Sequence, residues 1–183
     1  MRTAWRIERE TVGVARNYPD LEAVDVGGMD RFSLYKPGPY ACSKPLVFKA
    51  TRALDALSDY PFTTNRWPVF SARAAATFGD AAATFPVLVA LPNGRMESRR
   101  FVLCTAASLV DGLDMHASET RAHYFNPEAP RKVRKPVFRT DVDWPRLFRV
   151  QGYPLQAYVN GDAKHALEAL GARGVGFYPL ATA

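Results

Sequence analysis

Two pairs of carboxylates are the side chains of this sequence that best suit acid–base or metal chemistry: Asp111 with Asp114, and Asp141 with Asp143. Two neighbouring carboxylates can act as general acid and base, or can bind a divalent cation through their oxygens. Short acidic side chains also accept hydrogen bonds from nearby backbone N–H groups in turns. We favour this second interpretation, and predict that "VDGLDMHAS" at 110–118 leads into a helix through a turn in which Asp114 bonds local N–H groups.

The histidines and cysteines do not form a recognisable metal or nucleophile pattern. His116 and His123 are seven residues apart, a spacing that no metal site requires, and no cysteine lies near them. His165 falls on the polar side of a predicted helix, so we expect it to be exposed. Cys42 and Cys104 are far apart and form no C-x-x-C, and Cys104 stands inside the apolar run "FVLCTA". We therefore predict two free thiols packed in the core.

The common catalytic motifs are also missing. The chain has no G-x-G-x-x-G after a strand, no P-loop, no H-E-x-x-H and no G-x-S-x-G. We expect no catalytic residue, no metal and no cofactor. An enzyme of unknown type remains an alternative, and it would need polar side chains that converge in a pocket.

The basic run "RKVRKPVFR" at 131–139 is the feature that best suits binding of a macromolecule. Clusters of lysine and arginine bind phosphate groups by releasing counterions, and they attract an acidic protein surface equally well. The preceding prolines predict an exposed loop or hairpin tip, which a solvated charge run alone would also explain. Phe138 is the one aromatic residue of the run and no nucleic-acid-binding motif accompanies it.

Two segments of the chain share one pattern of strand, polar cap, helix and strand. In the first, the strand "WPVF" precedes Ser71, which caps an alanine-rich helix. We expect this helix to end near Gly79 in the αL conformation. The run "TFPVLVAL" is then a second strand, and it precedes the hairpin turn "PNGR" at 92–95. In the second, Asn160 is the cap, an apolar stripe from Ala163 to Leu170 predicts the helix, and "VGFYPL" is the last strand. We expect both helices to lie against one mixed or antiparallel sheet.

The N-terminal part, about 1–45, contains further strands and a rigid connector. "AWRIERE" and "RFSLY" alternate like half-buried strands, and "KPGPY" at 36–40 is a proline-fixed link. "PLVFKA" at 45–50 predicts another strand, and "TRALDALSDY" at 51–60 is either a short helix or a loop. The fold class that follows is α+β: one domain over 1–183, with a mixed or antiparallel sheet, few helices and two similar strand–helix–strand units.

Composition is that of a folded, water-soluble protein. Of the 183 residues, 48% are hydrophobic and 23% are charged, which is ordinary for a globular domain, and the net charge is +6. The N-terminal stretch has no apolar region typical of a secretory signal, and the apolar runs are too short to span a membrane. We expect a cytosolic protein whose partners carry negative charge.

The region from about 43 to 180 resembles immunity protein family eleven, bacterial proteins that neutralise polymorphic toxins. In "RLFRVQGYPLQAYVNGDAKHALEALGARGVGFYPL" at 146–180, a segment similar to "lFRi-G" precedes a strand, a polar cap, an "x-x-x-ALE-x-x-G" helix and a "G-x-x-F-x-P" strand. "WPVFSARAAATFGD", "FPVLVALPNGR" and "FVLCTAASLVDGLDMHASE" match the family's strand, Ser-capped helix, hairpin and "v-aLD---S" segment in the same order. Two cap-region residues depart from the pattern: Ala72 replaces an acidic residue and Asn160 replaces a serine.

The resemblance implies that the chain binds a toxin domain and blocks it by occlusion, without turnover. We expect the partner to carry an acidic patch; the identity of the toxin and the oligomeric state are left open. The residues that we expect at the contact come from "LDMHAS", from the basic run and from exposed aromatic residues near Trp144: Asp114, His116, Ser118, Arg131, Lys132, Arg134, Lys135 and Trp144. The alternative is a nucleic-acid-binding module that uses the basic loop at 131–139.

Overall fold

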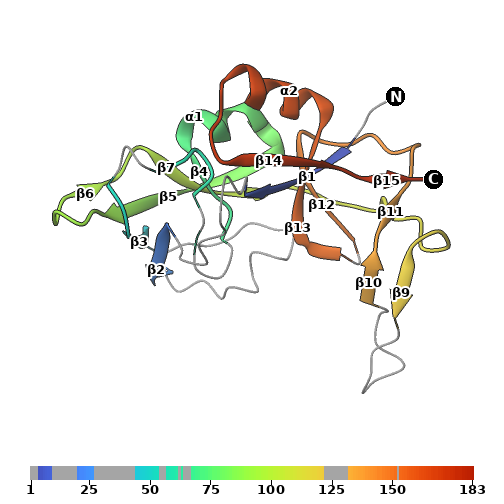
Figure 1. Cartoon of the computed structure of the whole chain (residues 1–183), viewed down its shortest axis with the longest axis horizontal. Coiled ribbons are helices and arrows are strands. Elements are labelled where there is room, and N and C mark those ends of the chain that lie inside the picture. The colour runs from blue at the N-terminus through green and yellow to red at the C-terminus, as the bar shows by residue number, and fades with distance from the viewer. Residues whose placement is uncertain are drawn as a thin grey trace.

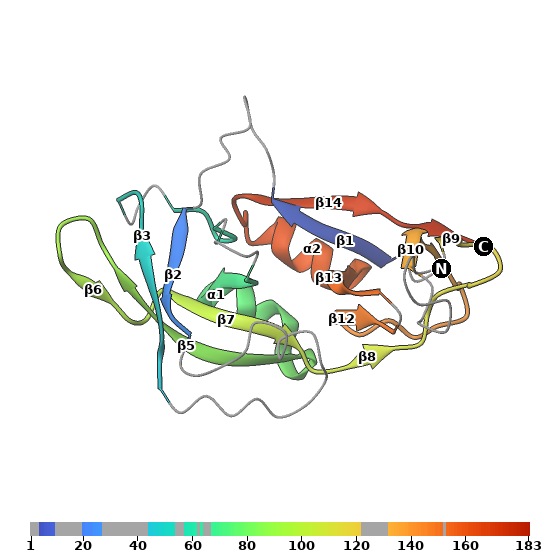
Figure 2. The ribbon, with the colours of Figure 1, turned by 90° about the horizontal axis from the view of Figure 1, so that it is seen from below.

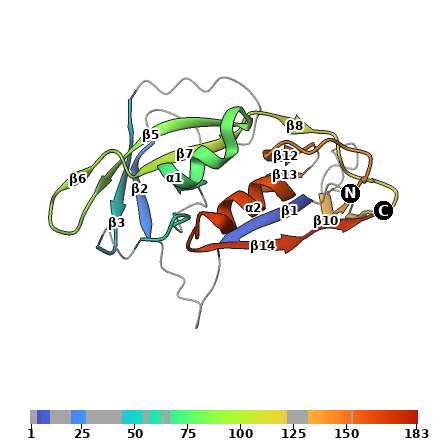
Figure 3. The ribbon, with the colours of Figure 1, turned by 90° about the horizontal axis from the view of Figure 1, so that it is seen from above.

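In the computed structural model of the chain, two β-sheets lie side by side and the helical segments lie on the same side of both (Figures 1 and 3). The structure describes residues 4–9, 20–26, 44–53, 57–61, 63, 67–121, 132–151 and 153–183. The predicted strand "RFSLY", the connector at 36–40 and Cys42 lie outside these residues. The α+β class with mixed sheets and few helices is confirmed. None of the described helices is long and apolar enough to cross a membrane.

The first sheet is built from the middle of the chain and has the order β2-β3-β5-β7-β4, with β6 paired to β5. β3 and β5 are parallel, whereas the other pairs are antiparallel. The predicted turn at 92–95 connects β5 to β6, with Gly94 at φ 80°. The strands are β2 (Leu21–Asp25), β3 (Leu46–Ala50), β4 (Val69–Ser71), β5 (Ala82–Ala90), β6 (Met96–Glu97) and β7 (Phe101–Ala106).

The second sheet joins the two ends of the chain in the order β14-β1-β13-β12-β8. The N-terminal strand β1 lies between β13 and β14 and is antiparallel to both, so the first residues complete a sheet formed mostly by the last forty (Figure 2). The strands are β1 (Ala4–Arg9), β8 (Leu109–Val110), β12 (Leu147–Val150), β13 (Tyr153–Asn160) and β14 (Val175–Pro179).

Two short pairs extend this end of the molecule. β9 (Glu119–Arg121) and β10 (Lys132–Lys135) are antiparallel, and β11 (Val137–Phe138) runs parallel to β15 (Ala181–Thr182). The basic run is therefore largely strand, and the prediction of a loop over 131–139 is wrong for its described residues. The described residues between 51 and 60 contain no helix, which favours the loop interpretation of that segment, and the turn at 110–118 leads to β9 rather than to the predicted helix.

The helical segments begin at the predicted caps. The Ser71 hydroxyl accepts the N–H of Ala74 at 3.3 Å at the start of α1 (Ala72–Ala75), which continues as the 3₁₀ helix η4 (Ala76–Ala81). The Asn160 side chain accepts the N–H of Ala163 at 2.9 Å at the start of α2 (Gly161–Ala169). Gly79 has φ 55° and ψ −139°, so its φ is positive as predicted, but it is not in the αL conformation.

Each helical segment connects two strands that are both antiparallel to a third strand between them. β4 and β5 flank β7, and β13 and β14 flank β1. The expectation that both helices share one sheet is wrong, because each lies against its own sheet. That the two segments are copies of one unit stays a prediction.

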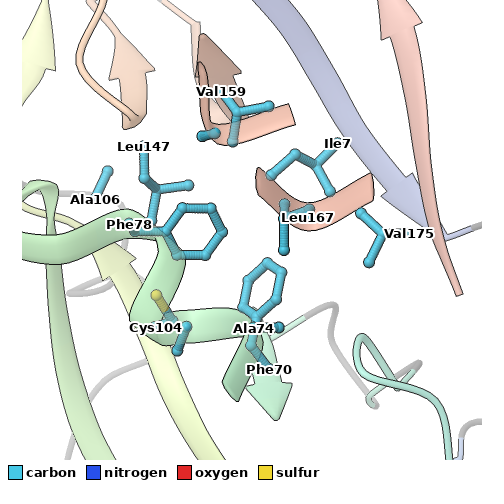
Figure 4. Close-up of a cluster of buried hydrophobic side chains, with 12 residues drawn as sticks. Ile7, Phe70, Ala74, Phe78, Cys104, Ala106, Leu147, Val159, Leu167 and Val175 are labelled. Atoms are coloured by element: carbon cyan, nitrogen blue, oxygen red, sulfur yellow. The ribbon is translucent and has the colours of Figure 1, made fainter. Parts of the chain in front are cut away.

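A central cluster of buried side chains holds the two sheets together (Figure 4). α2 lies against η4, and Phe70, Phe78 and Leu167 point toward one another between the sheets. β7 separates this cluster from a second one, because Cys104 faces the centre whereas Leu103 faces the other side of the sheet. Burying a large apolar side chain contributes roughly 1.5–3 kcal/mol, so the central cluster stabilises the packing of the two sheets against each other.

Candidate functional site

The turn at 111–118 is held by its own acidic side chain. The Asp114 carboxylate accepts the backbone N–H groups of His116 and Ala117, both at 2.9 Å. These bonds, the one from Ala117 first, lower the pKa of Asp114 below its usual value. The interpretation of Asp114 as a turn residue is confirmed, and its ordered turn leaves His116 and Met115 exposed.

Ser118 fastens this turn to the strand beside it. Its hydroxyl accepts the N–H of Val137 at 2.9 Å, and the Asp114 N–H donates to the Val137 carbonyl, also at 2.9 Å. The Ser118 side chain is buried. Ser118 thus supports the turn from inside, and its expected contact with a partner stays a prediction.

The basic hairpin β9–β10 presents its charges to solvent. The pairing register shifts between Val133 and Lys135; Val133 is buried, while the side chains of Arg134 and Lys135 are 58% and 81% exposed. Lys135 pairs with Glu119 at 2.7 Å and Arg134 approaches the same carboxylate at 3.8 Å. The hydrogen bond from Lys135 is the main reason why the pKa of Glu119 is lowered.

The remaining predicted contact residues are either buried or outside the described part. Trp144 is 3% exposed; its ring stacks on Phe148 with centroids 4.7 Å apart and meets Phe138 edge-on at 5.9 Å. Trp144 and Phe148 are both core residues, so Trp144 is not the exposed aromatic residue expected there. Arg131 and the side chain of Lys132 lie outside the described residues.

Trp144 nevertheless lies directly below the turn. A Cβ atom added at Gly112 would stand 2.2 Å from the Trp144 ring, so the turn backbone rests on the indole. The hydrogen bonds of Asp114 and Ser118 to Val137 and the pairing of β9 with β10 bring the turn next to the basic strand. We call their exposed part the turn–hairpin surface: Asp114, Met115, His116, Glu119, Arg134 and Lys135.

A second polar site, which the sequence did not predict, surrounds Asp59. It is a cleft of about 440 Å³ lined by residues from four separate segments: Asp59, Ser71, Ala72, Arg73, Arg100 and Arg173. We call it the arginine cleft. Ser71 was recognised as a helix cap, but its partners are too distant in the sequence for any short motif to join them.

Asp59 organises the arginine cleft. Its side chain is buried and accepts the Ser71 hydroxyl at 2.6 Å, Nε and Nη2 of Arg73 at 2.8 and 2.6 Å, and the Arg173 N–H at 2.9 Å. Burial alone would raise the pKa of Asp59, but the bonds from Arg73, Ser71 and Arg173 hold it well below its usual range. Asp59 is therefore an ionised, saturated anchor.

The other reactive side chains are packed or isolated. Cys104 is buried, which confirms the predicted packed thiol, and this burial raises the pKa of its thiol to about 12. His165 is exposed on α2, as predicted. Among the described residues, no three His, Cys, Asp or Glu side chains gather in a way that could hold a metal ion.

A comparison with models of known protein families finds none that matches this chain, and a search of curated proteins finds no match either. The similarity to immunity protein family eleven therefore stays an inference from the quoted motifs.

Proposed function

We propose that this chain is a cytoplasmic immunity protein, similar to immunity protein family eleven, that binds the toxin domain of a bacterial polymorphic toxin and blocks it by occlusion. In this role it performs no reaction; its folded body supplies a rigid surface. The motifs shared in order over 43–180 support the family, and the chemistry of the turn–hairpin surface supports the mode of binding.

The observation that carries the proposal is the juxtaposition of an anchored turn and a basic hairpin at one end of the molecule (Figure 1). Asp114 and Ser118 hold the turn, so its exposed side chains lose little conformational freedom when a partner binds. Met115 is 48% exposed and offers an apolar contact beside the charges of Arg134 and Lys135. An apolar contact with a charged rim is typical of protein interfaces.

Charge predicts the partner's chemistry. The positive charge is confined to the hairpin: Glu119 pairs with both Arg134 and Lys135, so one positive charge remains in excess among these three groups, while Asp114 makes the turn–hairpin surface as a whole neutral. An acidic patch on the toxin domain would meet this surface, and its binding should weaken as salt rises.

The proposal is tested by measuring affinity for the toxin domain encoded beside this chain, over a range of salt concentrations. The double variant R134E/K135E should bind about 10- to 100-fold more weakly, because two attractive charges become repulsive. Arg95→Glu is the matched control: it makes the same change on an exposed residue beside β6, at the opposite end of the molecule (Figure 1). Equal losses in both variants, or none in either, would contradict the assigned surface.

The wild-type chain and the R134E/K135E variant also test the alternative that the chain binds nucleic acid. If the basic strand bound phosphate backbones, the wild-type chain should retard DNA or RNA in a gel at low salt, and R134E/K135E should abolish the shift. The occlusion proposal expects no shift at submicromolar protein.

A further inference from the structure

The arginine cleft is built in two layers. In the inner layer, Asp59 is saturated by its four donors, and it fixes the position of the Arg73 guanidinium through two of them. Bidentate pairing with a carboxylate holds a guanidinium in one orientation. Nη1 of Arg73 makes no hydrogen bond to any described residue. Nη1 of the fixed Arg73 guanidinium can thus donate to another hydrogen-bond acceptor.

Two further guanidinium groups form the outer layer. Nη2 of Arg100 and Nη2 of Arg173 both donate to the carbonyl oxygen of Leu57, at 3.2 and 3.4 Å. Two cations therefore converge on one neutral oxygen. The Arg100 guanidinium also lies 5.4 Å from the centroid of the Phe101 ring, which restricts its position further.

From this geometry we propose that the arginine cleft binds an oxyanion, and that its ligand class is a phosphate group carried by a small molecule. The described side chains that line the cleft carry three guanidinium groups and one carboxylate, and that carboxylate already accepts all the donors around it. A phosphate monoester has several acceptor oxygens and close to two negative charges at neutral pH, which suits several guanidinium donors better than the single charge of a carboxylate.

The cleft's size and position agree with a small ligand. Its volume of about 440 Å³ falls within the range of small-molecule sites. Its lining residues lie at the start of α1, before β7 and before β14, whereas the turn–hairpin surface includes β9 and β10, which lie at one end of the molecule (Figure 2). The inference therefore does not depend on the proposed immunity function.

The test is a titration of the full chain with inorganic phosphate, followed by calorimetry or by amide chemical shifts, at constant ionic strength set with sodium chloride. We expect saturable binding that Arg100→Gln weakens about tenfold or more, since a charged hydrogen-bond donor is lost. Arg99→Gln is the matched control, because Arg99 is the exposed neighbour of Arg100 and does not line the cleft. It should leave the affinity unchanged.

Parallel titrations define the ligand. Adenosine monophosphate should bind and adenosine should not, which would show that a phosphate ester is accepted; acetate should bind far more weakly than phosphate. The proposal is overturned if phosphate binding does not saturate, if Arg99→Gln weakens it as much as Arg100→Gln, or if acetate binds equally well. Binding of a single-stranded oligonucleotide but not of phosphate or the mononucleotide would also overturn it. Thermal unfolding of both variants without ligand shows that each is folded.

Discussion

Replacing Asp59 by Asn tests the hydrogen-bond network around this buried carboxylate. The carboxylate joins its own segment to residues 71–73 and to Arg173, through its bonds to Ser71, Arg73 and the Arg173 N–H. An amide has one acceptor oxygen in place of two, and its NH₂ group would face donors where the second oxygen now lies. The variant keeps the volume of the side chain and removes its charge.

The expected loss of stability follows from which donors stay buried. The Arg173 N–H would lose its buried acceptor, at roughly 1–3 kcal/mol, and the Ser71 bond would fall from a charged to a neutral one, at roughly 1 kcal/mol. Arg73 has a half-exposed side chain that can turn to water, so its pairing adds little. We expect a total loss of about 3 kcal/mol.

Urea unfolding at neutral pH measures this loss. With a slope of about 2 kcal/mol/M for a chain of this size, the midpoint should fall by about 1.5 M. The control is Asp141→Asn: Asp141 accepts the same two nitrogens from Arg139, at 3.0 and 2.8 Å, but its side chain is 68% exposed. Its midpoint should not change measurably. Equal shifts for the two variants would refute the view that burial makes the Asp59 network important.

Acid provides a second arm of the same experiment. The pKa of Asp59 is lower in the folded state than in the unfolded state. The contribution of ionised Asp59 to the free energy of unfolding is therefore complete above the unfolded pKa of about 3.9, and it is lost as pH falls toward the folded pKa. The difference in stability between wild type and D59N should therefore be constant from pH 7 to about 5 and shrink below about pH 4. A difference that grows on acidification would contradict the assigned sign.

Three further outcomes test other parts of the structure. Gly112→Ala should lower the free energy of unfolding by roughly 2 kcal/mol, and so the urea midpoint by about 1 M, because the new methyl group would collide with the Trp144 ring; an unchanged midpoint would contradict the contact. In a Cys42→Ser variant, a thiol reagent at pH 8 should leave Cys104 unmodified until urea is added, because burial raises the pKa of its thiol to about 12. Rapid labelling of the folded chain would refute the burial of Cys104. Asn160→Ala should lower the stability measured in thermal unfolding by about 1–2 kcal/mol, because the helix cap and the bond from the Asn160 side chain to the Trp144 carbonyl are lost. A loss no larger than that of the control Glu168→Ala would count against the cap.

Local features of the fold could be predicted from the sequence because their causes are local. The caps at Ser71 and Asn160 and the turn at 92–95 depend on residues within a few positions of each other. The Asp114 turn follows the same rule. In each case a single side chain or glycine satisfies nearby backbone groups, so the residue types carry the signal.

The basic run was misjudged because its prolines and charges conceal an alternation. Val133 and Phe138 are buried while Arg134 and Lys135 between them are exposed, and the register shift in β10 breaks the period of two. Trp144 was chosen as a contact residue because exposed tryptophan often contributes strongly to interfaces. The glycine at 112, which makes room for its ring, gives no signal without the fold.

The arginine cleft could not be predicted for a different reason. Asp59, Arg73, Arg100 and Arg173 are separated by long stretches of chain and meet only after β4, β7 and the segment before β14 are in place. No spacing rule joins such residues. A site of this kind becomes visible only in three dimensions.

Co-expression with the protein encoded beside this chain, which the proposal expects to be the toxin, tests the central claim, function by binding, most directly. We expect host growth to be restored by the wild-type chain, and toxin and chain to co-purify in a fixed stoichiometry, with both effects reduced by R134E/K135E and kept by Arg95→Glu. Rescue without any stable complex, together with turnover of a small molecule by the purified chain, would contradict occlusion.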